Sequence, residues 1–187
     1  MIFYKGAGPG THWWTNDARI TGFSASPGVA NTNSMVRHIT AYSHPSPMLS
    51  FSASFAVARS YALSGPAGRA LASSPGYVYE IDITQGGLSP ALLKDPVREI
   101  LNSNPDVGTV ALLPTHHDGG QNLLHAIASP SRFGATLGTP PIRRGPNPRP
   151  PVVSDRLQAV IFALRDAEVL VSANVASACV VTRYNVH

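Results

Sequence analysis

Recurring hydrophobic and polar positions predict several short β-strands along the chain. The most regular pattern runs from Tyr77 to Ile83, where apolar residues recur with a period of two. Three shorter apolar segments are bounded by glycine, serine or proline and are also expected to be strands: Met1–Lys5, Met48–Ser52 and Thr109–Leu113. The chain is therefore expected to be rich in short strands.

Helical spacing of apolar residues is found in two short segments. Ala53–Leu63 places aromatic and small residues near one face and directly follows a predicted strand. Asp95–Asn102 is expected to be a short helix with Pro96 at its first position, where an N–H group has no partner within the helix in any case. Ser24–Ser34 and Gly65–Gly76 are rich in small and polar residues and are expected to be loops.

The C-terminal half contains a long segment that favours neither helix nor strand. Residues 129–151 are rich in proline, glycine and arginine. The chain then resumes with three apolar segments, Leu157–Leu164, Glu168–Val171 and Ala178–Arg183.

Short strands with few short helices predict an α+β fold of two packed, mainly antiparallel small sheets, rather than alternating βαβ units. The length of 187 residues predicts one domain over residues 1–187.

Composition indicates a folded chain. Hydrophobic residues make up 43% and charged residues 13% of the sequence, which is too apolar for a disordered protein. No apolar run reaches the roughly 18 residues needed to cross a bilayer. Residues 1–10 lack the basic segment and apolar core of a signal peptide, so none is expected. Cys179 is the only cysteine, and its apolar neighbours predict a buried thiol.

The charge is basic and is carried almost entirely by arginine. The formal net charge is +4, the sequence pI is about 9.6, and Lys5 and Lys94 are the only lysines. Arginine suits bidentate contacts to phosphate and carboxylate groups. This balance permits a nucleic acid, a dinucleotide or an acidic protein as partner, and a merely solvated basic surface equally well.

Three separated segments carry the residues of greatest chemical interest. Phe3–Gly6 ends the first predicted strand with a lysine and a glycine, and Ser50–Ser52 is a Ser-Phe-Ser strand end before a predicted helix. Asp166–Val171 is an acidic pair leading into a C-terminal strand. In this order they resemble the signature regions of the ADP-ribosyltransferases. That family has an aromatic-Arg/His-Gly on its first strand, a Ser-x-Ser strand before a helix, and a final x-x-Glu entering a strand. The resemblance spans residues 4 to 171.

The resemblance implies the split, two-sheet α+β fold of that family, NAD as the substrate, and Glu168 as the central catalytic residue. Breaking the nicotinamide–ribose bond places positive charge on the ribose, which a carboxylate can stabilise. Ser50 is then expected to orient Glu168. Asp166, two residues earlier, is expected to point the same way on an extended segment and to act near the acceptor. The family usually has Glu or Gln at that position, so the acceptor is left open.

A larger set of residues is implied in binding NAD. These residues are Tyr4, Lys5, Gly6, His12, Phe51, Ser52 and Tyr61. Lys5 stands where the family carries Arg or His, and it offers a phosphate only a point charge. His12, Arg37 or His38 could supply a further cation. Trp13 or Tyr61 could stack on nicotinamide, although aromatic residues at helical spacing are more often part of the core.

Three functions remain open on the sequence alone. The first is a mono-ADP-ribosyltransferase resembling bacterial toxins and effectors, with a protein or nucleic acid as acceptor and an inhibitory protein as a further partner. Such a protein would be cytoplasmic or delivered into a target cell. The second is an NAD glycohydrolase that uses water as acceptor. The third is a basic binding module without catalysis. Arg143, Arg144 and Arg149 would guide a target in the first case, or belong to a solvated loop.

A metal site is not expected. His116, His117 and Asp118 are adjacent, but neighbouring histidines on one strand or loop point apart, and no second group of ligands stands at a suitable spacing. The transfer of ADP-ribose also needs no metal, because nicotinamide is a good leaving group once the ribose charge is stabilised.

Overall fold

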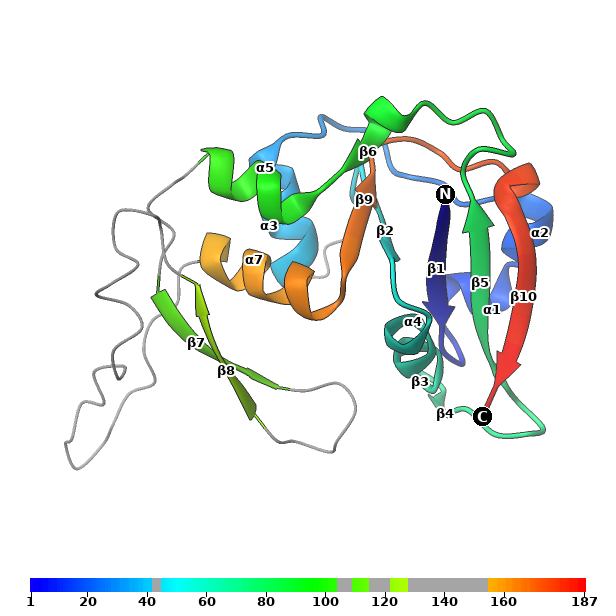
Figure 1. Ribbon diagram of the computed structural model, residues 1–187. Helices are drawn as coiled ribbons and strands as arrows, with labels where there is room; N and C mark the ends of the chain where they lie inside the picture. The colour runs from blue at the N-terminus through cyan, green and yellow to red at the C-terminus, as the bar shows by residue number, and fades with distance from the viewer. Residues whose placement is uncertain (42–44, 104–108, 115–121, 128–154) are drawn as a thin grey trace. The chain divides into compact units, whose positions relative to one another are not determined.

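The computed structural model describes residues 1–41, 45–103, 109–114, 122–127 and 155–187 (Figure 1). The chain is an α+β protein with mainly antiparallel sheets, as predicted from the short strands and few helices. The chain divides into two units. The first draws on Met1–Ala30, His44–Asp95 and Asp166–His187, and the second on Asn31–Ser43 and Pro96–Arg165.

The first unit is built on a six-stranded antiparallel sheet with the order β10-β5-β1-β2-β9-β6 (Figure 1). Its strands are β1 (Ile2–Ala7), β2 (Leu49–Ser52), β5 (Gly76–Asp82), β6 (Leu93–Lys94), β9 (Glu168–Val171) and β10 (Val180–Val186). The strands predicted over Met1–Lys5, Met48–Ser52 and Tyr77–Ile83 are therefore confirmed as β1, β2 and β5. β5 lies between β10 and β1, and its consecutive residues Val78 and Tyr79 are both buried, in two different hydrophobic clusters.

Short helices and one hairpin complete the first unit. They are α1 (His12–Thr15), α2 (Ala18–Thr21), β3 (Ser64–Gly65), β4 (Gly68–Arg69), the 3₁₀ turns η1 (Pro90–Leu92) and η2 (Ser177–Cys179), and α4 (Phe55–Ala62). The helix predicted after β2 is confirmed as α4. It begins at Phe55 because the Ser54 hydroxyl accepts a hydrogen bond from the N–H of Val57, which would otherwise be unpaired. The short helices α1 and α2 were not predicted.

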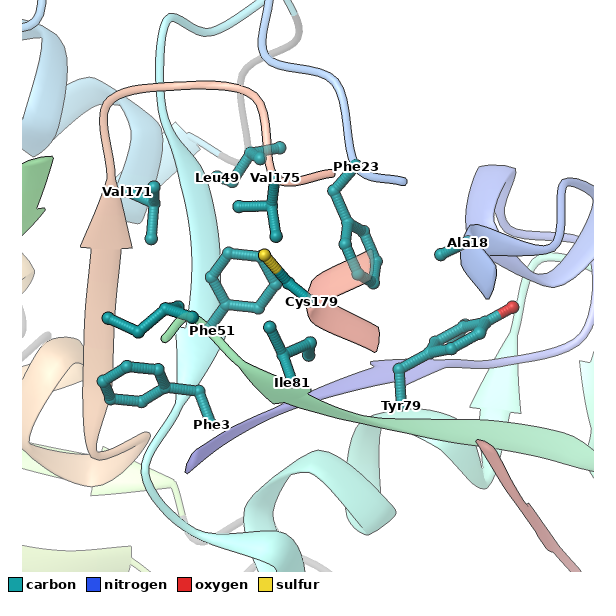
Figure 2. Close-up of a cluster of buried hydrophobic side chains, with 12 residues drawn as sticks. Phe3, Ala18, Phe23, Leu49, Phe51, Tyr79, Ile81, Val171, Val175 and Cys179 are labelled. Atoms are coloured by element: carbon teal, nitrogen blue, oxygen red, sulfur yellow. The ribbon is translucent and has the colours of Figure 1, made fainter. Parts of the chain in front are cut away.

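The main core of the first unit lies on one face of the sheet and is shown in Figure 2. Aromatic rings fill its centre: Phe23 meets Phe51 edge to face at 5.3 Å between ring centroids and meets Tyr79 in the same way at 5.6 Å. Cys179 is 1% exposed within this cluster, so the predicted buried thiol is confirmed. A smaller cluster joins Ala58 and Ala62 of α4 to Val78 and Val186.

The second unit contains three helices and one hairpin in its described part. These elements are α3 (Thr32–Ala41), α5 (Pro96–Ser103), α7 (Asp155–Arg165), and the antiparallel pair β7 (Thr109–Pro114) and β8 (Asn122–Ile127). The predicted strand at residues 109–113 and the helix at 95–102 are confirmed. α3 overlaps the end of the loop predicted over Ser24–Ser34, and its buried Met35, Val36 and Ile39 have helical spacing.

Several sequence expectations fall outside the described residues. The proline- and arginine-rich segment, with Arg143, Arg144 and Arg149, is one of them, and His116-His117-Asp118 is another. Among the helices that the structure describes, none combines the length and the apolar character needed to span a membrane.

Candidate functional site

Two hydroxyl residues of β2 face the acidic residue that begins β9. The two strands pair so that Ser52 is opposite Glu168 and Ser50 is opposite Leu170. The Ser50 hydroxyl donates a hydrogen bond to Oε1 of Glu168, a diagonal cross-strand contact. Both residues are half-buried. The sheet register, rather than a loop, thus sets the position of the Glu168 carboxylate.

Lys5 of β1 joins the same group from the other neighbouring strand. β1 and β2 share the residue pair Tyr4–Ser52, and beyond it the Lys5 ammonium donates to the main-chain oxygen of Ser50 at 2.8 Å. Burial lowers the pKa of the Lys5 amino group from its ordinary value, and attraction to the Glu168 carboxylate opposes that shift. Lys5 therefore fixes the main chain next to Glu168 and supplies the opposite charge.

The turn before Glu168 is held by the junction between β2 and α4. The Ser52 hydroxyl donates to the main-chain oxygen of Asp166 at 2.6 Å, and the N–H of Ala53 donates to the oxygen of Ala167 at 2.9 Å. Ala167 has a φ of 46° and is the one described residue other than glycine in the left-handed region. The extended conformation expected for Asp166 is wrong: Asp166 and Ala167 form a turn, and β9 begins at Glu168.

Tyr61 of α4 contacts the side chain of Asp166. Its hydroxyl donates to Oδ2 of Asp166 at 2.7 Å, and the residue is half-buried. The structure thus brings Tyr61 to the acidic pair by a hydrogen bond between side chains 105 positions apart in the sequence. Neither the core position nor the stacking position considered from the sequence required this contact.

Gly6 has a packing role that the sequence did not reveal. A Cβ at position 6 would lie 2.0 Å from the main-chain oxygen of Ala58 and 2.9 Å from Cβ of Tyr61. Only glycine allows α4 to lie this close to β1. Tyr4 contacts the same helix through its ring, which meets Phe55 edge to face at 5.4 Å. Both residues of this motif therefore position α4.

The other expected NAD-binding residues differ in where they lie. Phe51 is 3% exposed and packs in the core with Phe23 (Figure 2). His12 is exposed on α1, where its ring lies edge to face with Trp13 at 4.4 Å. Trp13 in turn packs against Phe23 at 4.9 Å, which is a core contact. Arg37 and His38 belong to α3 of the second unit.

Metal coordination has no counterpart in the described part of the chain. No three His, Cys, Asp or Glu residues within it are grouped closely enough to hold a metal ion.

The arrangement around Glu168 suits one kind of chemistry. A carboxylate that accepts a hydrogen bond from a neutral hydroxyl has a fixed direction and, when ionised, can stabilise positive charge that develops beside it. The nearby ammonium of Lys5 balances the carboxylate in the resting protein. Its contact with Ser50 is with the main chain, so the ammonium keeps two further N–H donors.

Comparisons with known proteins identify no family for this chain. No protein-family model and no curated protein sequence matches the chain. Among solved structures, one described as "CARDS toxin, nicked" is similar, with a TM-score of 0.49 and 15% sequence identity over 98% of this chain. The chain spans about a quarter of that protein, 25% of its length.

Proposed function

We propose that the chain is a mono-ADP-ribosyltransferase that cleaves the nicotinamide–ribose bond of NAD and transfers ADP-ribose to a macromolecular acceptor. The observation that carries the proposal is the hydrogen bond from Ser50 to Glu168 across β2 and β9. It joins two residues that the resemblance to the ADP-ribosyltransferases had already singled out, although 118 positions separate them. The resemblance suggests NAD as the substrate, and the hydrogen-bonded carboxylate of Glu168 is a group that could promote its cleavage.

Glu168 would act on the charge that develops during bond cleavage. Nicotinamide leaves with the electron pair of the glycosidic bond, and the ribose carbon becomes positive before the acceptor forms its new bond. A fixed carboxylate stabilises this state more than the ground state, which is the condition for raising the rate. Ser50 would hold the carboxylate in place so that no reorganisation is needed at that moment.

The residues around this pair would bind and orient NAD. Lys5 would offer its remaining N–H donors to the anionic part of the substrate, while Tyr4, Ser52 and Tyr61 shape the surroundings from β1, β2 and α4. With a macromolecular acceptor the protein would act as a toxin or effector. With water as acceptor, the same site would release free ADP-ribose instead.

Nicotinamide release from NAD by the purified protein tests the proposal. Glu168→Gln keeps the shape of the side chain and removes its charge, so release should fall by a factor of about a hundred or more. Glu80→Gln is the matched control, because Glu80 lies in the same sheet and accepts a hydroxyl hydrogen bond from Tyr184 at 2.8 Å. Its turnover should equal that of the unmodified protein.

Adding cell lysate and labelled NAD separates the acceptors. A labelled macromolecule supports transfer, whereas free ADP-ribose alone indicates hydrolysis. If the unmodified protein releases no nicotinamide with or without lysate, the proposed function is wrong.

A further inference from the structure

The main chain before Glu168 adopts a conformation that its sequence does not favour. Ala167 lies in the left-handed region with a φ of 46°. The Cβ of alanine disfavours this region by about tenfold, whereas glycine has no such penalty. An alanine stays there only where surrounding contacts hold it, and such residues concentrate at functional sites. The position directly precedes the carboxylate on which the proposed chemistry depends.

Three of the hydrogen bonds at this turn come from one stretch of β2 and α4. Ser52 and Ala53 bind the main-chain oxygens of Asp166 and Ala167. The hydroxyl of Tyr61 binds the Asp166 carboxylate at 2.7 Å. The first two contacts fix where the turn lies relative to β2. The third is the side-chain contact, and it ties the turn to the helix.

The position of Tyr61 is itself fixed by β1. α4 packs closely on β1 at Gly6, where a Cβ, had the residue carried one, would lie 2.9 Å from the Cβ of Tyr61. α4 is also packed through Ala58 and Ala62, which belong to a buried cluster. The Tyr61 hydroxyl therefore reaches Asp166 from a helix whose position is set by packing against the sheet.

We propose that Tyr61 is a positioning residue for Glu168. By holding the Asp166 carboxylate, it keeps the Asp166–Ala167 turn left-handed at Ala167 and so keeps the Glu168 carboxylate within reach of the Ser50 hydroxyl. Its kinetic consequence rests on the proposed function, whereas its structural consequence does not.

This role differs from stacking on the nicotinamide ring in what the phenol must supply. Stacking needs the aromatic ring, which phenylalanine keeps. The hydrogen bond to Asp166 needs the hydroxyl, which phenylalanine lacks. Tyr61→Phe therefore separates the two roles. Tyr184→Phe is the matched control, because the Tyr184 hydroxyl also donates to a carboxylate, that of Glu80, at 2.8 Å on another part of the sheet.

The first experiment measures the turn directly, by NMR hydrogen exchange of the full chain. The Ala53 amide bonds to Ala167, so it reports opening of the turn, while the amides of β5 report global unfolding. Tyr61→Phe should speed Ala53 exchange by about tenfold, the change expected for losing a hydrogen bond to a charged group. β5 amides should speed by no more than the same factor, because the bond is also lost on global unfolding, and Tyr184→Phe, which removes a hydrogen bond outside the turn, should leave Ala53 unchanged. An unchanged Ala53 rate in Tyr61→Phe would overturn the proposal.

The second experiment tests whether the hydrogen bond from Tyr61 to Asp166 supports the catalytic action of Glu168. Tyr61→Phe should lower kcat for nicotinamide release by about tenfold and leave KM for NAD nearly unchanged, since Glu168 acts in the transition state. Introducing Ala167→Gly should restore most of the lost kcat, because glycine adopts the left-handed turn unaided. An equal loss with and without Ala167→Gly would contradict the role of the turn. If the unmodified protein releases no nicotinamide, the proposed function fails, and the Ala53 exchange rate alone decides whether Tyr61 holds the turn.

Discussion

The hydroxyl of Ser50 donates a hydrogen bond to the carboxylate of Glu168 although 118 positions separate them in the sequence. The antiparallel register of β2 and β9 produces this contact, and Lys5 supports it from β1 by binding the main-chain oxygen of Ser50. Three adjacent strands therefore each contribute one group. A site built on paired strands holds its geometry better than one built on loops.

Removing the Ser50 hydroxyl should reduce turnover without unfolding the protein. Ser50→Ala loses the donor that directs Glu168, and one hydrogen bond to a charged group is worth about 1.5–3 kcal/mol, or about ten- to a hundredfold in rate. Nicotinamide release measures the effect. Ser60→Ala is the control, because the Ser60 hydroxyl donates a hydrogen bond to the main-chain oxygen of Val57 within α4. Equal turnover in both variants would remove Ser50 from the mechanism.

The buried ammonium of Lys5 should make stability depend on pH in the alkaline range. Burial holds its pKa in the folded protein below the ordinary value of 10.5, so the unfolded chain binds more protons as pH approaches 10.5. Stability contributed by this residue should then rise with pH. The difference in the free energy of unfolding between the unmodified protein and Lys5→Met should shift in favour of the unmodified protein as pH rises from neutrality toward 10.5.

Chemical denaturation at a series of pH values gives that difference. The titration of the tyrosines, including Tyr79, whose pKa is raised by burial, is common to both proteins and cancels in the difference. A difference that stays constant or falls over the same range would show that Lys5 is not desolvated.

Gly6→Ala should destabilise the first unit. The added methyl group would meet the main-chain oxygen of Ala58 at 2.0 Å, so α4 must move away from β1. Such overpacking costs about 1–3 kcal/mol and should lower Tm in a thermal melt. Ala56→Ser adds one atom on the exposed side of the same helix and should leave Tm nearly unchanged. A Tm for Gly6→Ala equal to that of the control would contradict the close packing at this glycine.

Asp17 should stabilise the protein at neutral pH and lose this effect in acid. Hydrogen bonds from Arg19, with a smaller contribution from Arg183, hold the pKa of its carboxyl below the ordinary value of 3.8. A depressed pKa in the folded state gives stability that is present above 3.8 and lost as pH falls below it. Asp17→Asn keeps the cap on α2 and removes the charge.

The expected cost of Asp17→Asn at neutral pH is about 1 kcal/mol, small because the pair is partly exposed. Thermal melts of both proteins should therefore converge as pH is lowered. Curves that stay equally far apart in acid would assign the effect to something other than the charge of Asp17.

Much of the sheet could be predicted because its strands carry their pattern locally. β5 shows a period of two, and β1 and β2 are apolar segments that end at glycine or serine. α3 was harder to predict, because threonine, asparagine and serine open it and resemble a loop, although Met35 and Ile39 have helical spacing. The segment that becomes α7 was recognised as apolar, but its helical character was not predicted.

Some residues of the candidate site could likewise be predicted from the sequence, and others could not. Ser50 and Glu168 could be predicted by resemblance, since their residue types stand in a known order. Ala167 could not, because alanine gives no sign of a left-handed conformation, whereas a glycine would have done so. The contact between Tyr61 and Asp166 depends on how α4 packs on β1, which is a tertiary property. The same holds for Lys5, whose amino group binds a main-chain oxygen of the neighbouring strand.

The most direct test of the account compares binding and turnover of NAD in Glu168→Gln. Isothermal titration gives Kd for NAD, and nicotinamide release gives kcat, for this variant and for the unmodified protein. If Glu168 stabilises the charge that develops during bond cleavage, kcat should fall by a factor of about a hundred or more while Kd changes little. Unchanged kcat in a folded Glu168→Gln protein would contradict the central role of this carboxylate.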